Sequence, residues 1–303
     1  MRVSDKIMKT AVAVLAVLLF VVSANAELTG WWRFDNAGNI GQDSSEYGND
    51  GTIVGNCSFS TDAVSGAGAL EFTGGYIQLY SCSINDYEGD FSDGAASLAM
   101  WIKLDSANPS PSYNGFANIG AWCYPSYYPS SGNALSLKLF LSEGDSIVVD
   151  LPANTVFSMW HHFVVTVDAM DTSSGYKVYF DGSLIGEFPM DGSFGNFLPP
   201  QRPSLGAAYD VQSNTWSCTL GIIDDVRIYN SILTSQQIQM LIYNPDLNGD
   251  KSVDFTDLEM MTGSWLGQCS SPDWCGGADI NRDSYINFAD FTILAEQWMQ
   301  TMP

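Results

Sequence analysis

The part of the chain between residues 27 and 243 consists mainly of short segments in which apolar and polar residues alternate. Apolar residues occupy every second position from Leu98 to Leu104, and the same period recurs from Leu135 to Leu141. A period of two places these side chains on one face of a strand, so the segments predict half-buried β-strands. Between two further segments, Asp181-Gly182 tolerates the positive φ angles of a tight hairpin turn. Because Gly, Asn, Ser and Pro separate many such segments, we expect an antiparallel β-sandwich.

The pattern changes to a helical period near residue 244. Just before this boundary, Thr234 and Gln237 have the spacing of a capping box, which predicts one short helix. Beyond the boundary, two stretches carry apolar residues with the spacing of a single helical face. These residues are Leu258, Met261 and Trp265, and then Phe291, Leu294 and Trp298. We therefore expect a sandwich domain over residues 27–243 and a small helical domain over residues 244–303.

Each amphipathic stretch follows a twelve-residue segment that is rich in Asp and Asn. Asp246–Asp257 and Asp279–Asp290 both carry oxygen-bearing side chains at positions 1, 3, 5, 9 and 12. Calcium takes six to eight oxygen ligands, and a twelve-residue loop supplies them from such positions and from the carbonyl at position 7. A solvated acidic tail is the alternative, but a tail does not require apolar residues at matching offsets. Position 6, usually Gly, carries Lys251 and Ser284, so we expect weak calcium binding.

Two such loops, each followed by a helix, resemble a type I dockerin, a calcium-dependent module that docks onto cohesin modules. The resemblance extends from residue 246 to about residue 300, and it implies two Ca²⁺ ions and a cohesin-like partner. At positions 10 and 11, which largely select the partner in that family, this chain has Phe255-Thr256 and Phe288-Ala289 in place of the usual hydroxylic or basic residues. The implied ligands are the side chains of Asp246, Asn248, Asp250, Asp254, Asp257, Asp279, Asn281, Asp283, Asn287 and Asp290, with the backbone carbonyls of Ser252 and Tyr285.

Five segments of the larger region, in chain order, resemble parts of a laminin-G-like, or concanavalin A-like, jelly roll. They are Gly30–Phe34, Asp43–Gly51, Ala69–Ile77, Trp160–Thr166 and Ile223–Asn230. The resemblance implies a mainly β fold, an antiparallel jelly-roll β-sandwich, ahead of the small α-helical domain with its two dockerin/EF-hand-like calcium loops. That family often holds one calcium ion against its last strand, for which the candidate ligands are Asp43, Asn49, Asp224 and Asp225. The alternative is a hydrogen-bonded turn, since Asp, Ser and Asn side chains bond to their own backbone.

The first 26 residues have the three parts of a secretory signal. Arg2, Lys6 and Lys9 precede an apolar run over Ala11–Val22, and Ala24-Asn25-Ala26 provides a cleavage site. The run is shorter than the roughly 20 apolar residues that a spanning helix needs. We therefore expect cleavage after Ala26, no membrane insertion afterwards, and a secreted or cell-surface protein.

The net charge limits the classes of possible partner, and the cysteine content limits the possible disulfides. The net charge of −23 excludes nucleic acid as a partner, because phosphate binding requires clustered Lys and Arg. In an exported protein, six cysteines permit disulfides. Cys269 and Cys275 are candidates for one bridge, and a zinc site is the weaker alternative because no His or third Cys is nearby in sequence. The pairing of the others remains open from sequence: Cys57, Cys82, Cys123 and Cys218.

The sequence contains no complete catalytic pattern. Glucanases with this fold carry their two catalytic acids in the motif Glu-x-Asp-x-x-Glu, because two carboxylates must flank the glycosidic bond. Glu143-Gly144-Asp145 is a partial match, but Val148 stands where the second Glu should be. His161 and His162 have no acid positioned beside them in sequence. We therefore expect a protein that is not an enzyme and has no catalytic residues.

Aromatic residues crowd one Gly-, Ser- and Pro-rich stretch, and exposed rings on loops are suited to binding sugars. The candidates are Tyr113, Trp122, Tyr124, Tyr127 and Tyr128. The alternative is that these rings pack in the core. We expect a secreted carbohydrate- or glycoprotein-binding module attached to an extracellular assembly through its dockerin-like domain. The alternatives are a structural or adhesion protein without glycan binding, and a polysaccharide-degrading glycoside hydrolase.

Overall fold

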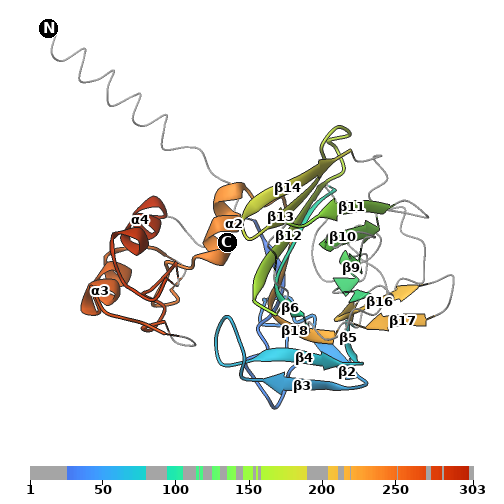
Figure 1. Ribbon diagram of the computed structural model, residues 1–303, viewed down its shortest axis with the longest axis horizontal. Coiled ribbons are helices and arrows are strands. Elements are labelled where there is room, and N and C mark those ends of the chain that lie inside the picture. The colour runs from blue at the N-terminus through green and yellow to red at the C-terminus, as the bar shows by residue number, and fades with distance from the viewer. Residues whose placement is uncertain are drawn as a thin grey trace, which may run out of the picture.

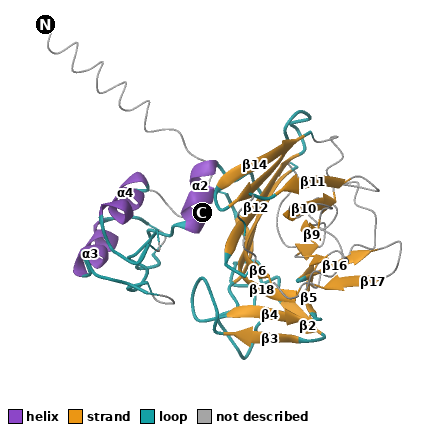
Figure 2. Ribbon diagram, viewed as in Figure 1, coloured by secondary structure: helices purple, strands orange, loops and turns teal. Residues whose placement is uncertain are grey.

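The structure is a computed structural model. It describes residues 26–79, 94–104, 114–115, 117–118, 125–129, 135–140, 146–152, 155, 158–189, 204–210, 215–218, 220–250, 252–270, 274–281 and 283–299. Figures 1 and 2 show that strands form the larger body and that helices α3 and α4 lie together to one side of it. The signal peptide predicted over residues 1–26 lies almost entirely outside the described residues and stays a prediction, as do the two domain boundaries.

The largest sheet has eight strands in the order β14-β13-β12-β6-β18-β4-β3, with β1 paired to β18. All of its pairings are antiparallel. Its strands are β1 (Leu28–Trp32), β3 (Cys57–Ser60), β4 (Ala69–Thr73), β6 (Ala95–Leu104), β12 (His161–Asp168), β13 (Tyr176–Phe180), β14 (Ser183–Phe188) and β18 (Leu220–Tyr229). The sheet brings the first and last strands of the larger domain side by side.

The remaining strands form a six-stranded sheet in the order β11-β10-β9-β7-β17-β16 and a four-stranded sheet in the order β2-β5-β15-β8. They are β2 (Gly51–Val54), β5 (Tyr76–Leu79), β7 (Asn114–Gly115), β8 (Ala117–Asn118), β9 (Pro125–Pro129), β10 (Leu135–Phe140), β11 (Ser146–Asp150), β15 (Ser204–Leu205), β16 (Ala207–Asp210) and β17 (Thr215–Cys218). One pairing, between β7 and β17, is parallel. The predicted fold class, a mainly antiparallel jelly-roll β-sandwich with a small helical domain, is confirmed.

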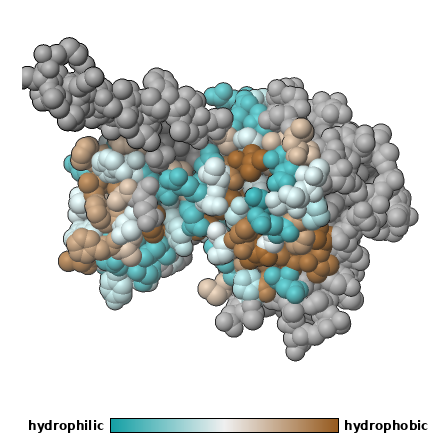
Figure 3. Space-filling view, turned by 90° about the horizontal axis from the view of Figure 1, so that it is seen from above, coloured by the Kyte–Doolittle hydropathy of each residue, from teal (hydrophilic) through white to brown (hydrophobic). Residues whose placement is uncertain are grey.

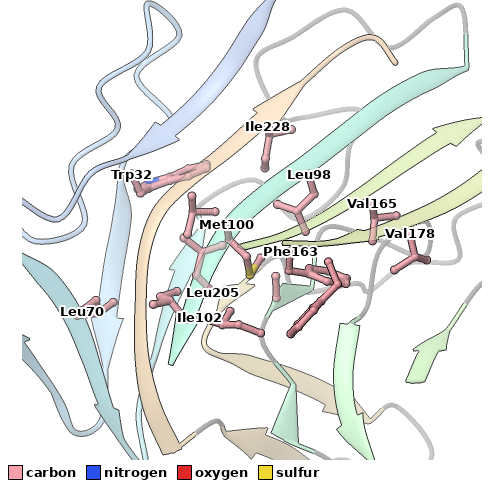
Figure 4. Packing of buried hydrophobic residues seen from close by; sticks show 14 of the residues in the cluster. Trp32, Leu70, Leu98, Met100, Ile102, Phe163, Val165, Val178, Leu205 and Ile228 are labelled. Carbon is pink, nitrogen blue, oxygen red and sulfur yellow. The ribbon is translucent and has the colours of Figure 1, made fainter. Parts of the chain in front are cut away.

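The main hydrophobic core lies against one face of the eight-stranded sheet. Leu98, Met100 and Ile102 of β6 are fully buried against this core, so the predicted strand is confirmed. They meet Phe163 and Val165 of the neighbouring strand β12 (Figure 4). Burying each such side chain contributes roughly 1.5–3 kcal/mol relative to leaving it exposed, so these two strands are a main source of the stability of the jelly roll. The expectation that β6 is half-buried is wrong, because Ala99 and Trp101 on its other face are only 1% and 7% exposed.

The other face of this sheet is covered by the predicted short helix. Helix α2 (Ser235–Ile242) begins at the capping box of Thr234 and Gln237, as its spacing predicts. Its apolar side packs on the sheet in a second core that contains Ala99, Val164, Tyr179, Tyr229, Leu233, Ile238 and Leu241. The Gln239 side chain also donates a 2.9 Å hydrogen bond to the carbonyl of Gly182. The helix is thereby fixed to the β13–β14 hairpin, whose turn residues Asp181 and Gly182 have the predicted positive φ angles of 47° and 75°.

The C-terminal domain has a core of its own beneath α3 (Phe255–Gly263) and α4 (Phe288–Glu296). Met261, Leu294 and the position-8 residues Val253 and Ile286 are fully buried in it. Partly buried side chains that pack against this core include Leu258, Trp265, Ile293 and Trp298. On α4, Leu294 is buried in the core and Ile293 packs against it, whereas Phe291 is 37% exposed. No helix among the described residues is both long enough and apolar enough to cross a membrane.

Candidate metal centre

The two acidic loops cap the helices that follow them in the same way. In the first loop, Asp254 at position 9 accepts the N–H of Thr256, and Asp257 at position 12 accepts the N–H of Asp254. In the second, Asn287 accepts the N–H of Ala289 and Asp290 accepts the N–H of Asn287. Positions 9 and 12 therefore form a capping box in each loop, which fixes the first turn of each helix.

The first half of each loop also repeats. Asp246 at position 1 accepts the N–H groups of Gly249 and Asp250, and Asn248 at position 3 accepts the N–H of Asp250 at 2.9 Å. In turn, Asp250 at position 5 accepts the N–H of Ser252 at position 7. The first loop thus winds around the side chains that the sequence predicts as ligands.

The second loop repeats three of these contacts, from the N–H of position 5 to positions 1 and 3 and from the N–H of position 7 to position 5. Asp279 accepts the N–H groups of Asp283 and Ser284, Asn281 accepts the N–H of Asp283 at 3.0 Å, and Asp283 accepts the N–H of Tyr285. Ser284, at position 6, lies at φ 81°, the left-handed conformation for which such loops usually use Gly. Its counterpart Lys251 lies outside the described residues.

Three loop carboxylates are fully or almost fully buried, and two of them, Asp279 and Asp290 of the second loop, interact electrostatically. Asp257 and Asp290 are fully buried, and Asp279 is 1% exposed. Burial, and then the charge of Asp290, raise the pKa of Asp279 above its usual value. Among the described residues, no Lys or Arg forms an ion pair with any of these three carboxylates. A cation would stabilise the charged form of these buried carboxylates, and the hard oxygen donors fit calcium.

The ligand set itself stays a prediction. Within the described ranges, no three His, Cys, Asp or Glu side chains converge in an arrangement that could hold a metal ion. The carboxylates instead accept hydrogen bonds from the loops' own N–H groups, such as those of Leu247 and Asn248 to Asp257. The fit for calcium therefore rests on the donor chemistry and on the buried like charges.

A disulfide joins Cys269 and Cys275 in the segment between the two helices. The Cα atoms are 5.4 Å apart, so the predicted bridge is confirmed and the zinc alternative is wrong. Of the other cysteines, Cys82 and Cys123 lie outside the described residues.

In the jelly roll, Asp43 organises its own loop. Its carboxylate accepts the N–H groups of Trp31, Ser45 and Asn49 and the hydroxyl of Ser45. The side-chain amide of Asn49 donates to the carbonyl of Thr29 at 2.9 Å. These contacts are those of a hydrogen-bonded turn, the alternative that the sequence left open.

Asp224 and Asp225 occupy a bulge in β18, where its pairing changes from β4 to β1. Asp224 is fully buried and accepts the N–H groups of Val64, Ser65 and Asp225. Burial raises the pKa of Asp224 to about 8, although these three donors oppose that shift. Asp225 contacts Trp31 and forms an ion pair with Arg227 at 3.1 Å. Asp43 and Asp225 thus both accept hydrogen bonds from Trp31, whereas Asp224 accepts hydrogen bonds from the loop at Val64 and Ser65. A calcium ion at these residues stays a prediction.

The structure brings an acid to the two histidines that the sequence did not place beside them. Asp181, in the hairpin turn, lies 2.8 Å from Nδ1 of His161 and accepts the N–H of His162. Its Asp-Gly signal revealed the turn, but only the strand register shows which residues it faces. The partial catalytic triplet at 143–145 lies outside the described residues, and Val148 is 49% exposed.

Most of the aromatic stretch lies outside the described residues, including Tyr113, Trp122 and Tyr124. Tyr127 and Tyr128 belong to β9, where their backbones pair with Leu137 and Ser136 of β10. Their side chains are not described.

Sequence reasoning overlooked two matching apolar clusters on the surface of the C-terminal domain. Cluster 1 consists of Phe255, Trp298 and Met299, and cluster 2 consists of Phe288, Trp265 and Leu266. In each, the Phe and Trp rings meet edge to face, with centroids 4.9 Å and 5.3 Å apart. Both Phe side chains, Leu266 and Met299 are 72–75% exposed. Hydrophobic residues reach the surface in this part of the molecule in Figure 3.

The comparisons with known proteins agree with this architecture. A model of the concanavalin A-like lectin/glucanases superfamily matches residues 73–239, and a model of the type I dockerin domain matches residues 244–298. No curated protein matches the chain.

Solved structures with TM-scores of 0.50 or more show the same fold at low identity. The binding domain of botulinum neurotoxin DC in complex with SialylT is 15% identical, over 72% of this chain and 52% of that chain, with a TM-score of 0.51. The receptor binding domain of botulinum neurotoxin C/D mosaic serotype is 13% identical, over 75% and 53%, with a TM-score of 0.50. Domain 4 of AbnA, an extracellular arabinanase from Geobacillus stearothermophilus, in complex with arabinotriose, is 22% identical, over 71% and 98%, with a TM-score of 0.49. Because the first family model covers more than half of the sequence, this chain belongs to the concanavalin A-like lectin/glucanases superfamily, and a type I dockerin domain follows its jelly roll.

Proposed function

We propose that this protein is a secreted, non-catalytic module that binds a polysaccharide or glycoprotein and is attached to an extracellular assembly through its dockerin domain. The observation that carries the proposal is the repeated loop network, within the residues that the dockerin model matches. A dockerin implies a cohesin-bearing partner. The acidic surface, with a net charge of −23, is consistent with a protein that neither binds nucleic acid nor inserts into a membrane.

Two calcium ions would complete the dockerin domain. Their ligands would be Asp246, Asn248, Asp250, Asp254, Asp257 and the Ser252 carbonyl, and Asp279, Asn281, Asp283, Asn287, Asp290 and the Tyr285 carbonyl. Calcium would supply positive charge to the buried carboxylates, which form no ion pair with a Lys or Arg in the described part of the chain. Because the same carboxylates cap α3 and α4, its binding free energy would become folding free energy.

The two apolar clusters are the proposed docking surface for the cohesin-like partner. Each cluster contains the Phe at position 10 of a loop, and position 10 is one of the two positions that largely select the partner in the family that this domain resembles. Exposed aromatic side chains are common anchors of interfaces. Since the clusters match one another, either could bind the same surface of the partner. That surface should be apolar at its centre.

The jelly roll would supply the ligand-binding surface, and its fold is shared with the botulinum neurotoxin DC binding domain solved in complex with SialylT. The test is a glycan array and an insoluble-polysaccharide pull-down with the mature protein, followed by Tyr127→Ala and Tyr128→Ala. Binding that one of these changes weakens supports the proposal. A folded protein that retains no glycan supports the structural or adhesion alternative, and release of reducing sugar supports the glycoside hydrolase alternative.

A further inference from the structure

The segments that carry the disulfide of the dockerin domain hydrogen-bond directly to the backbone of the second loop. The backbone N–H of Cys269 donates a 2.9 Å hydrogen bond to the carbonyl of Ser284, at position 6 of that loop. The preceding residue, Gln268, forms an antiparallel bridge with Tyr285 at position 7. One arm of the disulfide thus holds the middle of the loop, where the predicted carbonyl ligand lies.

The other arm holds the start of the same loop. Cys275 accepts the N–H of Ala278, and the adjacent Trp274 accepts the N–H of Asp279, at position 1, at 3.1 Å. Cys269 is 5% exposed and packs with Ala278 in the core of the domain. The S–S bond therefore ties the two backbone segments that fix positions 1, 6 and 7 of the second loop.

The residues that the disulfide holds adopt costly backbone conformations. Ser284 lies at φ 81°, Trp274 at φ 46° and Cys275 at φ 58°. Left-handed conformations are unfavourable for residues other than Gly, because Cβ crowds the following carbonyl. A cross-link that holds these residues in place lowers the entropy lost when the loop closes, so less of the calcium binding free energy is needed to organise the loop.

The first loop contains no comparable cross-link. The sequence has no cysteine between Cys218 and Cys269. The approach to the first loop is held by the Asn244 side chain, which accepts the N–H of Asp246 at 3.1 Å. Two loops that share several internal hydrogen bonds thus differ in how their entry is fixed.

We propose that the Cys269–Cys275 disulfide positions the second calcium loop, so that this loop binds calcium more tightly than the first and loses that advantage when the bridge is removed. The inference rests on the proposed function, in which both loops bind calcium. Cys269 and Cys275 are positioning residues here and contact no metal. Reduction by dithiothreitol breaks the S–S bond with two electrons and two protons to give two thiols, while the reagent is oxidised to its cyclic disulfide.

The test is amide hydrogen exchange of the mature, full-length protein across a calcium titration, with a separate midpoint for residues 246–257 and for residues 279–290. The intact protein should protect the second loop at the lower calcium concentration. In the Cys269→Ala/Cys275→Ala variant, or after reduction, the second midpoint should rise about tenfold, if calcium must then stabilise one left-handed residue unaided. The first midpoint should move by less than about threefold, because the backbone hydrogen bonds of Cys269 and Trp274 are made to the second loop, at Ser284 and Asp279.

A matched rescue separates positioning from general stability. Ser284→Gly, added to the double cysteine variant, should bring the second midpoint back toward the intact value, because Gly adopts positive φ freely. Equal shifts of both midpoints, or an unchanged second midpoint, would overturn the positioning role while leaving calcium binding intact. Loops that show no calcium-dependent protection even with the disulfide intact would overturn the proposed function and this inference with it.

Discussion

The indole N–H of Trp31 donates a 2.6 Å hydrogen bond to the carboxylate of Asp225. This contact joins β1 to the bulge of β18, where Asp225 is 7% exposed and lies at φ 48°. The guanidinium groups of Arg33 and Arg227 lie 4.9 Å and 4.7 Å from the centroid of the Trp31 ring. One side chain therefore both satisfies a buried carboxylate and stacks with two cations, where the first and last strands of the jelly roll meet.

The Trp31→Phe variant should destabilise the jelly roll. It keeps a ring near the two arginines but removes a donor from a buried carboxylate, and a hydrogen bond to a charged group contributes about 1.5–3 kcal/mol. The free energy of unfolding, measured by urea titration with circular dichroism at fixed calcium, should fall by that amount. Trp160→Phe is the control, because its indole donates to the half-exposed Asp62 and should cost under about 1 kcal/mol. Equal losses in the two variants would contradict this account.

The buried histidine predicts acid sensitivity. Burial lowers the pKa of His162 to about 3, so the folded protein keeps this ring neutral in mild acid. The unfolded chain takes up the proton near pH 6.5, so the stability that depends on it is complete above that pH and is lost as the pH falls toward about 3. Between pH 7 and pH 5 the loss should be about 2 kcal/mol.

His162→Phe should remove this part of the acid dependence while retaining a ring beside Trp101. Urea unfolding of both proteins at pH 7 and pH 5 gives the change in the free energy of unfolding for each. Subtracting one change from the other removes the contribution of the carboxylates, which both proteins share. A variant that loses as much stability in acid as the original would show that the His162 proton makes no contribution.

The matched apolar clusters predict how docking responds to mutation. Phe255→Ala or Phe288→Ala alone should weaken capture of a cohesin module only a few-fold, because one cluster remains. The double variant should lose at least about 2 kcal/mol of binding, roughly 30-fold, as expected for truncated interface anchors. Surface plasmon resonance against a panel of cohesins measures this. Phe291→Ala is the control, because Phe291 is exposed on α4 outside both clusters; a double variant that binds like this control would rule the clusters out as the docking surface.

Much of the fold follows from local sequence rules. The period of two at Leu98–Leu104 correctly predicts β6, and the Asp181-Gly182 pair predicts the turn of the β13–β14 hairpin. Thr234 and Gln237 predict the start of α2. Each of these signals depends on residues a few positions apart, so the chain carries them without tertiary information. The repeated loops belong to the same class, because their spacing and their capping contacts are both local.

The features that the sequence did not predict depend on register between distant segments. Asp181 faces His161 only because β12 and β13 pair as they do. The bulge at Asp224 arises where β18 exchanges one partner strand for another, which periodicity does not reveal. Helical spacing likewise places Phe291 on one apolar face with Leu294, but spacing alone does not show that Leu294 is buried while Phe291 is 37% exposed.

Calcium dependence of the dockerin domain is the central claim, and amide exchange over residues 246–299 of the mature protein tests it most directly. This segment surrounds buried carboxylates, and from Asp246 onward the sequence offers only Lys251 and Arg282 against ten acidic residues. The account predicts that calcium protects α3 and α4, that EDTA opens them, and that Asp250→Ala with Asp283→Ala abolishes the protection. Unchanged protection in protein whose metal content is confirmed at zero would contradict the account and leave the two loops as ordinary turns.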